Sequence, residues 1–225
     1  MRLKFVHKKS ETKRVYSYFF EPDTQQDWIA GQSIKLEFPQ ILDSTERRFT
    51  ISSAPSEESI RITTASSGSD FKNELHKLDA GDQVIANSIN GDFIWRETSL
   101  HTVFLAAGIG VTPYRAILAD RVLSGKQIPS TLIYANRDPE ELVFKQEFDE
   151  WQSLHPEFKV IYQIEKRLDL GFISQHCDMA NSLFYVSGPG GMVDDIVDGL
   201  KSHGITDENI IKDWFVGLDS KYPVH

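Results

Sequence analysis

The feature that most constrains the fold is a short apolar run followed directly by a glycine-rich turn. Residues 103–107 read Val-Phe-Leu-Ala-Ala, which is typical of a strand buried on both faces. Residues 108–113 read Gly-Ile-Gly-Val-Thr-Pro, so two glycines permit a tight turn, and Thr112 and Pro113 suit the start of a helix. Free amides and the helix dipole would then point toward an anion such as a diphosphate. Because Pro113 stands where G-x-G-x-x-G has its third glycine, a strand–helix turn without a ligand stays an equal alternative.

The second half of the chain alternates short apolar strands with amphipathic helices. Strands are expected near 103–107, 131–135, 159–164 and 183–187. Each intervening helix has an apolar face, made by Tyr114, Ile117, Leu118 and Val122, by Phe144, Phe148 and Trp151, and by Met192, Val193, Ile196, Val197 and Leu200. Asp138 and Pro139 are expected to open the second of these helices. Alternation of this kind predicts a parallel, Rossmann-like α/β sheet with right-handed crossovers.

The first hundred residues have the period of antiparallel strands. Polar and apolar residues alternate over 14–20, 32–38, 59–64 and 83–87, with Gly, Asn and Asp supplying the turns between them. Residues 1–8 alternate like an edge strand, and a short helix is expected over 70–78. Strands at this spacing predict an antiparallel barrel or sandwich. We place the boundary near 95–101, which gives an N-terminal β-barrel domain over 1–98 and a C-terminal α/β domain over 99–225.

Composition excludes several classes of protein. The net charge of −9 argues against nucleic acid or an anionic membrane as a partner. Residues 1–100 hold 13 Lys/Arg and 15 Asp/Glu, whereas residues 101–225 hold 11 and 18, which also suggests two domains. The single Cys177 excludes an internal disulfide and a Cys-ligated iron–sulfur cluster, and His176 beside it is interpreted as a structural neighbour. No apolar run approaches a membrane span, and a reducing cytoplasm is the expected compartment.

A basic segment in the β half suits a phosphate-bearing ring system. Residues 47–53 read Arg-Arg-Phe-Thr-Ile-Ser-Ser, the pattern R-x-[YF]-[ST]-x-x-S. Arg47 is a fixed cation that can pair bidentately with phosphate, Phe49 offers a ring face, and Thr50 can donate or accept a hydrogen bond at a flavin edge. An exposed basic turn that leads into a strand is the alternative interpretation of this run.

Five motifs in order give the chain a resemblance to the ferredoxin–NADP reductase superfamily. They are Trp28–Gln32 (aromatic-x-A-G-Q), Arg47–Ser53, Asn90–Phe93 (part of G-x-x-G-x-F), Gly108–Pro113 (G-x-G-x-T-P) and Ser187–Met192 ([CS]-G-P-x-x-M). The resemblance covers nearly the whole chain. It implies a FAD-binding β-barrel followed by an NAD(P)-binding α/β domain.

The resemblance also implies roles for individual residues. Thr50 would lie near flavin N5, and Ser187 and Gly188 would border the nicotinamide, so Thr50 and Ser187 are the expected catalytic residues. Residues expected to hold flavin are Arg47, Phe49, Thr50, Ser53, Thr64, Gly68, Ser69, Asp70, Phe71 and Lys72. Those expected to hold the nicotinamide nucleotide are Gly108, Gly110, Val111, Thr112, Pro113, Asn136, Arg137, Ser187, Gly188, Pro189 and Met192. The segment 68–72 also suits pyrophosphate through free helix amides, although an ordinary capped surface helix is an equal alternative, and Ser187 also suits the end of a strand.

The implied function is hydride transfer from NADH or NADPH to FAD, and then electron transfer to a separate acceptor. That acceptor could be a ferredoxin, a flavodoxin, a haem protein, an oxygenase component or free flavin. Ile164-Glu165 at the end of the third parallel strand leans toward NADH, although the adjacent Lys166 and Arg167 leave NADPH open as the alternative. Since Leu218 is not aromatic, Phe215 or Trp214 could lie near the flavin instead, with burial in the core as the plainer alternative. The nicotinamide face is expected to be less obstructed than in plant-type reductases. A monomer without metal is expected. The alternatives are a free-flavin reductase and a non-catalytic nucleotide-binding regulatory module.

Overall fold

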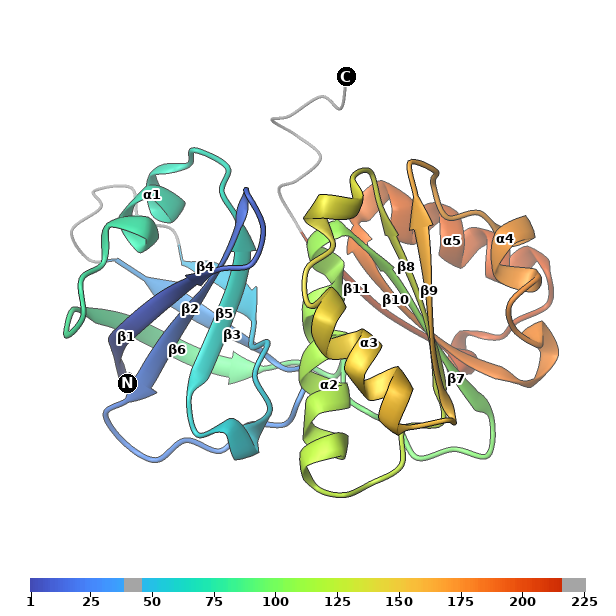
Figure 1. Cartoon of the computed structure of the whole chain (residues 1–225), viewed down its shortest axis with the longest axis horizontal. Helices are drawn as coiled ribbons and strands as arrows, with labels where there is room; N and C mark the ends of the chain where they lie inside the picture. Colours follow the sequence, from blue (N-terminus) through green and yellow to red (C-terminus); the bar gives the residue numbers. More distant parts are fainter. Residues whose placement is uncertain (39–45, 216–225) are drawn as a thin grey trace. The chain divides into compact units, whose positions relative to one another are not determined.

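The protein consists of two compact units in a computed structural model (Figure 1). The structure describes residues 1–38 and 46–215. The first unit contains Met1–Trp95 together with Thr112–Gly125, and the second contains Arg96–Val111 and the chain from Lys126 on. The helix α2 (Thr112–Leu123) therefore groups with the β-rich unit, although the strands on either side of it in sequence belong to the other unit.

The first unit is built on a six-stranded antiparallel sheet, as the sequence predicted. Its strands are β1 (Arg2–Ser10), β2 (Val15–Pro22), β3 (Ser33–Glu37), β4 (Arg47–Thr50), β5 (Ile60–Ala65) and β6 (Gln83–Asn90). The strand order is β4-β3-β6-β1-β2-β5, and one bridge between Ile51 and Ile62 joins the two ends into a barrel. The 3₁₀ turn η1 (Pro55–Glu57) and the helix α1 (Asp70–Lys77) follow β4 and β5 respectively. Phe20, Leu36 and Leu75 are among the fully buried side chains of the barrel core.

The expectation that residues 1–8 form an edge strand is wrong. β1 pairs with β2 on one side and with β6 on the other. Leu3 and Phe5 point into the barrel core, while Arg2 and Lys4 are exposed. An alternating pattern shows that one face of a strand is buried, but it does not show whether both strand edges are paired.

The second unit contains a five-stranded sheet in which all neighbouring strands are parallel, which confirms the predicted α/β class. Its strands are β7 (His101–Ala107), β8 (Ser130–Asn136), β9 (Phe158–Ile164), β10 (Ser182–Pro189) and β11 (Ile210–Phe215), in the order β11-β10-β7-β8-β9. Its helices are α3 (Lys145–Leu154), α4 (Leu170–Ser174) and α5 (Gly190–Ser202). The 3₁₀ turns are η2 (Gly108–Val111), η3 (Pro139–Glu141), η4 (Met179–Asn181) and η5 (Asp207–Asn209).

Alternate residues of the parallel strands pack on opposite faces of the sheet. Val103, Leu105 and Val186 belong to the same core cluster as residues of α4 and α5. The residues between them, such as Phe104 and Tyr185, are fully buried on the other face. Both faces are therefore covered, which explains why these strands read as continuous apolar runs.

The second predicted helix begins later than expected. Asp138 caps only the short turn η3, where its side chain accepts a hydrogen bond from the Glu140 amide. Phe144 then adopts a left-handed backbone (φ +62°), and α3 starts at the following residue. The buried Tyr134 hydroxyl accepts the Val143 N–H at 3.2 Å, so the amide that a helix would use is satisfied elsewhere.

Candidate nucleotide-binding sites

The carboxyl ends of the parallel strands offer the geometry of a ligand site. From β7 the chain continues to β8 and β9 on one side of the sheet, whereas β10 and β11 lie on the other side. The order of strands therefore reverses between β7 and β10. In open α/β sheets, ligands bind in the crevice outside the carboxyl ends at such a switch point. The predicted segments Gly108–Pro113 and Ser187–Met192 follow or complete these two strands.

The turn after β7 is open at its first glycine and tightly packed at its second. Gly108 has φ +53°, and no atom lies within 4 Å of where a Cβ would stand. A Cβ on Gly110 would lie 2.4 Å from the Ser187 carbonyl oxygen and 2.6 Å from Gly188 Cα. Val111 and Thr112 are buried. The helix α2 starts at Thr112, one residue before Pro113, which was the expected first helical residue. Gly110 thus packs the turn against β10, and Gly108 leaves room beside it.

The end of β10 carries a buried hydroxyl without a hydrogen-bond partner. Ser187 is fully buried, and its Oγ makes no hydrogen bond in the structure. Buried hydroxyls are nearly always paired, so this one is suited to a bound molecule. Gly188 follows with φ +157°, and a Cβ there would lie 2.6 Å from Met192 Cε and 3.3 Å from Ala107. These residues are compatible with the predicted contact to the nicotinamide end of a nucleotide.

The ends of β8 and β9 are held by their own hydrogen bonds. The Asn136 amide donates to the Glu141 carbonyl at 2.7 Å and accepts from the Arg137 N–H at 2.8 Å. Its side chain therefore shapes the loop after β8, while Arg137 is exposed. Glu165, the first residue after β9, has φ +62° and donates its N–H to the Asn136 carbonyl at 3.0 Å. This backbone bond fixes the point at which the exposed Glu165 leaves the sheet.

The predicted flavin strand, β4, presents two exposed cations, Arg47 and Arg48, and one buried hydroxyl. Arg47 is exposed at the start of β4, whereas Thr50 at its end is 5% exposed. Phe49 lies half-buried between them, and its ring centroid is 5.6 Å from that of Phe71 at the start of α1. Ser53 is buried and accepts the Arg61 N–H on its Oγ at 3.0 Å. β4 and α1 thus bring six predicted flavin residues into one unit, and two of them, Phe49 and Phe71, touch.

The segment that leads into α1 provides a cationic pocket. Gly68 has φ +69°, and no atom lies within 4 Å of the place that a Cβ would take, so the backbone is open there. Lys72 Nζ donates to the Ala65 carbonyl at 2.8 Å, and burial lowers the pKa of its ammonium group. A cavity of about 270 Å³ lies beside it, lined among others by Thr64 and His76. A partly buried ammonium that lines this cavity suits a phosphate-bearing ligand.

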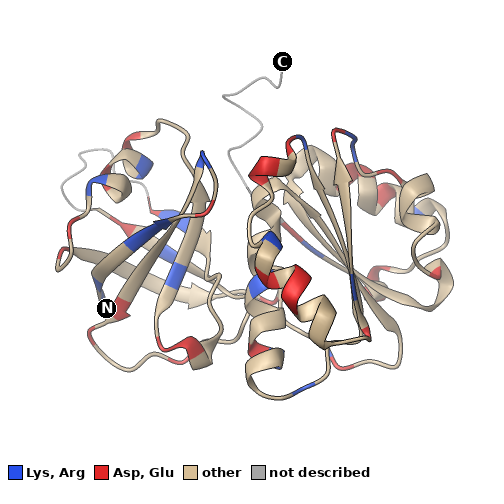
Figure 2. Ribbon diagram, viewed as in Figure 1, with Lys and Arg blue, Asp and Glu red and all other residues tan. Residues whose placement is uncertain are grey.

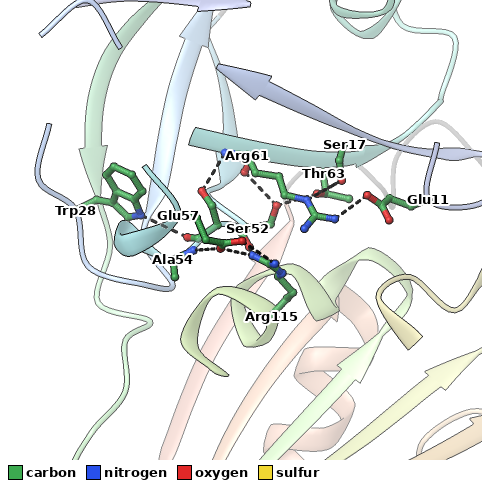
Figure 3. A network of polar contacts seen from close by, with 10 residues as sticks. Glu11, Ser17, Trp28, Ser52, Ala54, Glu57, Arg61, Thr63 and Arg115 are labelled. Atoms are coloured by element: carbon green, nitrogen blue, oxygen red, sulfur yellow. Dashed lines mark hydrogen bonds and ion pairs between the residues drawn. The ribbon is translucent and has the colours of Figure 1, made fainter. Parts of the chain in front are cut away.

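A buried polar network lies behind the flavin strand, and no sequence motif pointed to it (Figure 3). Arg61 donates to Ser17 Oγ at 3.0 Å and to Glu11 Oε1 at 2.6 Å, and both charged side chains are about 5% exposed. Thr63 Oγ1 lies 2.8 Å from the hydroxyls of Ser17 and Ser52. Burial alone would raise the pKa of Glu11, but the Arg61 charge and hydrogen bonds from its neighbours outweigh it and hold the pKa below its ordinary value.

At the other end of this network, Arg115 from α2 contacts Ser52 and Glu57 in the loop that follows β4 (Figure 3). Arg115 is 6% exposed. The partners are 63 and 58 residues apart in sequence, so no local pattern could have paired them.

Several Lys and Arg side chains of the first unit lie along the β1–β2 hairpin and on α1. Lys8, Lys9, Lys13 and Arg14 lie in or beside the β1–β2 hairpin, and Lys72 and Lys77 lie on α1 (Figure 2). The Lys8 ammonium donates to the His76 carbonyl, which links the hairpin to α1.

Among residues 1–38 and 46–215, no group of three or more His, Cys, Asp or Glu side chains is arranged to hold a metal ion. Across the same residues, no helix is both long enough and apolar enough to cross a membrane.

Cys177 is a packing residue in its surroundings. Its Sγ lies 3.3 Å from the Ile173 carbonyl and 3.9 Å from Met179 Sδ. Burial, together with the Asp178 charge, raises the pKa of the thiol to about 11.

The expected aromatic contact from the tail cannot be placed: the backbone of Phe215 lies in β11, but its side chain and Leu218 fall outside the described part of the chain.

Comparison with known proteins agrees with this geometry. Residues 104–198 match the family described as Oxidoreductase NAD-binding domain. The flavohemoprotein of Deinococcus radiodurans is 27% identical over 222 residues, which cover 87% of this chain and 55% of the relative. The chain thus spans about half the length of that curated relative.

Two solved structures superpose on nearly the whole chain. The FAD/NAD-binding domain of nitric oxide dioxygenase from Vibrio cholerae has a TM-score of 0.83 at 24% identity, and covers 95% of this chain and 98% of that one. A ferredoxin NADP+ reductase from Neisseria gonorrhoeae, solved with bound FAD and NADP, has a TM-score of 0.83 at 18% identity with the same coverage. Residues 104–198 thus match an oxidoreductase NAD-binding domain, and the barrel followed by the parallel sheet has the fold of a ferredoxin NADP+ reductase.

Proposed function

We propose that this chain is a flavin-dependent NAD(P)H oxidoreductase that passes electrons to a separate acceptor. The observation that carries the proposal is the carboxyl edge of the parallel sheet, where the open turn at Gly108 lies at the switch point next to the buried, unpartnered hydroxyl of Ser187. The match of residues 104–198 to an oxidoreductase NAD-binding domain supports it, as do the bound FAD and NADP of the Neisseria relative.

Five of the predicted site residues have a defined task in this proposal. When bound, the flavin supplies the electron chemistry, because its N5 position accepts hydride. Arg47 and the open backbone at Gly68 would hold phosphate, and Phe49 would flank the ring system. The Thr50 hydroxyl would form a hydrogen bond at the flavin edge, and Ser187 would orient the nicotinamide ring. The protein contributes alignment and exclusion of water, which is what hydride transfer between two rings requires.

An anaerobic titration of the purified protein tests this proposal. We expect about one equivalent of bound FAD and bleaching of its visible absorption by a stoichiometric amount of NADH. Protein that binds nucleotide but leaves flavin oxidised would instead support a non-catalytic module. Protein that turns over free flavin without retaining any would support a free-flavin reductase.

For the acceptor, we propose a haem protein, because the relative from Deinococcus radiodurans is a flavohemoprotein. A screen with the reduced protein should compare a haem protein, an acidic ferredoxin, a flavodoxin and free FMN at equal concentration. Fastest reoxidation by the ferredoxin or flavodoxin would overturn this choice.

For the nucleotide, we propose a preference for NADH based on Glu165. Its exposed carboxylate leaves the sheet at the carboxyl edge, and a carboxylate there accepts a ribose hydroxyl but repels a 2′-phosphate. Glu165→Gln should raise kcat/KM for NADPH and leave that for NADH nearly unchanged, whereas the neighbouring Lys166→Gln should not. Equal or better use of NADPH by the native protein would refute the preference.

A further inference from the structure

The helix α2, which begins at the predicted nucleotide-binding turn 108–112, also contacts the loop that follows the predicted flavin strand β4. Arg115 lies one helical turn after Thr112, and its side chain is 7% exposed. Its Nη1 donates to the Ser52 carbonyl at 3.1 Å, and its Nη2 donates to Glu57 Oε1 at 2.8 Å. Nη1 also contacts Glu57 Oε2, so the carboxylate is held bidentately (Figure 3).

Glu57 in turn fixes the loop itself. Its Oε2 accepts the Ala54 N–H at 2.6 Å, so one carboxylate joins the start of the turn η1, its end and the guanidinium of Arg115. The Trp28 indole N–H donates to the Ser53 carbonyl at 3.4 Å. The segment 52–57 is thus held from three directions, and it begins two residues after Thr50.

The geometry favours one rigid connection over a simple surface ion pair. A nearly buried guanidinium needs a counter-charge and filled donors, and here a carboxylate and a carbonyl supply them. Removing either member would leave the other poorly paired. The compact unit formed by Met1–Trp95 also includes Thr112–Gly125, so this contact lies inside one unit.

We propose that Arg115 is a positioning residue that couples nucleotide binding at the turn 108–112 to flavin binding at β4. The inference rests on the proposed function. Closure of the turn and the first helical amides around a phosphate would move the first turn of α2, and Arg115 would pass that movement to Ser52 and Glu57. Because linkage is reciprocal, each ligand must then change the affinity of the other by the same factor.

The test uses ADP-ribose as the probe, because it has no nicotinamide ring that could stack on flavin. The dissociation constant of FAD is measured by fluorescence quenching with and without saturating ADP-ribose. The dissociation constant of ADP-ribose is measured by calorimetry on apoprotein and on FAD-loaded protein. In the native protein we expect both ratios to agree, at about fivefold or more.

Three variants and one matched control locate the coupling. Arg115→Met should bring both ratios to about one, Glu57→Gln should reduce them, and Arg115→Lys should retain part of the effect. Arg121→Met is the control, because Arg121 is also a buried arginine of α2 but stacks 4.0 Å over the Trp95 ring. It should leave the ratios unchanged. If Arg115→Met does not fold by circular dichroism, Glu57→Gln and Arg115→Lys decide the question.

Two results would overturn the coupling. One is a native protein in which both ligands bind but neither affects the other. The second is a ratio that persists in Arg115→Met or Glu57→Gln as it does in Arg121→Met, which would leave Arg115 a purely structural role. Failure of the proposed function looks different: both ligands bind with coupling, yet NADH does not bleach the flavin. Protein that binds neither ligand would overturn both.

Discussion

Replacing Gly110 by alanine should damage the second unit by steric overlap alone. The added methyl group would stand 2.4 Å from the Ser187 carbonyl oxygen and 2.6 Å from both the Ser187 carbonyl carbon and Gly188 Cα. Real Cβ atoms essentially never approach closer than 3.0 Å, so the turn must move by at least 0.6 Å from the oxygen. All three atoms are backbone, and none can rotate away.

Overpacking of this kind costs about 1–3 kcal/mol, and rigid backbone on the opposing side favours the upper end. For a chain of this size, about 3 kcal/mol corresponds to a fall in Tm of roughly 6–12 °C. The free energy of unfolding should be measured by urea titration, followed by both tryptophan fluorescence and far-ultraviolet circular dichroism. Agreement of the two probes would also show whether the two units unfold together.

Two other glycines supply matched controls. Gly191 in the first turn of α5 has no atom within 4 Å of its Cβ position and no positive φ, so Gly191→Ala should be neutral or stabilising by up to about 1 kcal/mol. Gly108→Ala adds left-handed strain without a clash and should cost about 1–2 kcal/mol. A Gly110→Ala protein as stable as Gly191→Ala would refute the steric argument.

Three further predictions concern single side chains. Ser187→Ala removes an unpartnered buried hydroxyl, so the urea midpoint should stay or rise slightly while flavin reduction by NADH slows; a loss above about 1 kcal/mol would reveal a partner within the protein. The Arg61 charge and neighbouring hydrogen bonds outweigh burial and hold the folded-state pKa of Glu11 below 4.5. The ionised Glu11 carboxylate therefore stabilises the fold above pH 4.5, and this stabilisation is lost as the pH falls through the lowered pKa. Glu11→Gln should flatten this acid limb of urea midpoint against pH, and parallel curves between about pH 5 and 3 would contradict it. Cys177, with a pKa of about 11, should react with a disulfide reagent at about pH 8 roughly 100-fold more slowly in native protein than in urea; equal rates would refute its burial.

The class of each half was predictable because strand and helix periods are local properties of a sequence. Motif segments were also predictable, and the structure explains several of them physically. Gly31 has φ +98°, and a Cβ there would lie 2.0 Å from the Phe93 carbonyl, which ties the motif at Trp28–Gln32 to the one that ends at Phe93. The Gln32 amide donates to the Gly91 carbonyl at 3.3 Å and strengthens the same junction.

Features that depend on distant partners could not be predicted from the sequence. The interior position of β1 follows from its second pairing, with the distant strand β6, which alternation along one strand does not reveal. The delayed start of α3 depends on a hydroxyl of β8 that takes an amide out of the helix. No sequence motif marked Arg115 or Arg61, because their acidic partners lie 58 and 50 residues away. A single sequence offers no signal for such pairs.

The return of α2 to the barrel unit has a consequence for how the protein is made. All six barrel strands have been synthesised by residue 95, but Glu57 has no guanidinium partner until Arg115 follows, 20 residues later. Protein synthesis proceeds at about 5–20 residues per second. The barrel strands of the nascent chain therefore exist for about 1–4 s before Arg115 is available to pair with Glu57. Its last element arrives only after β7 of the other sheet has been made, so the two units mature in an interleaved order. A ribosome that pauses between residues 95 and 115 would prolong the state in which the barrel lacks the Arg115–Glu57 contact.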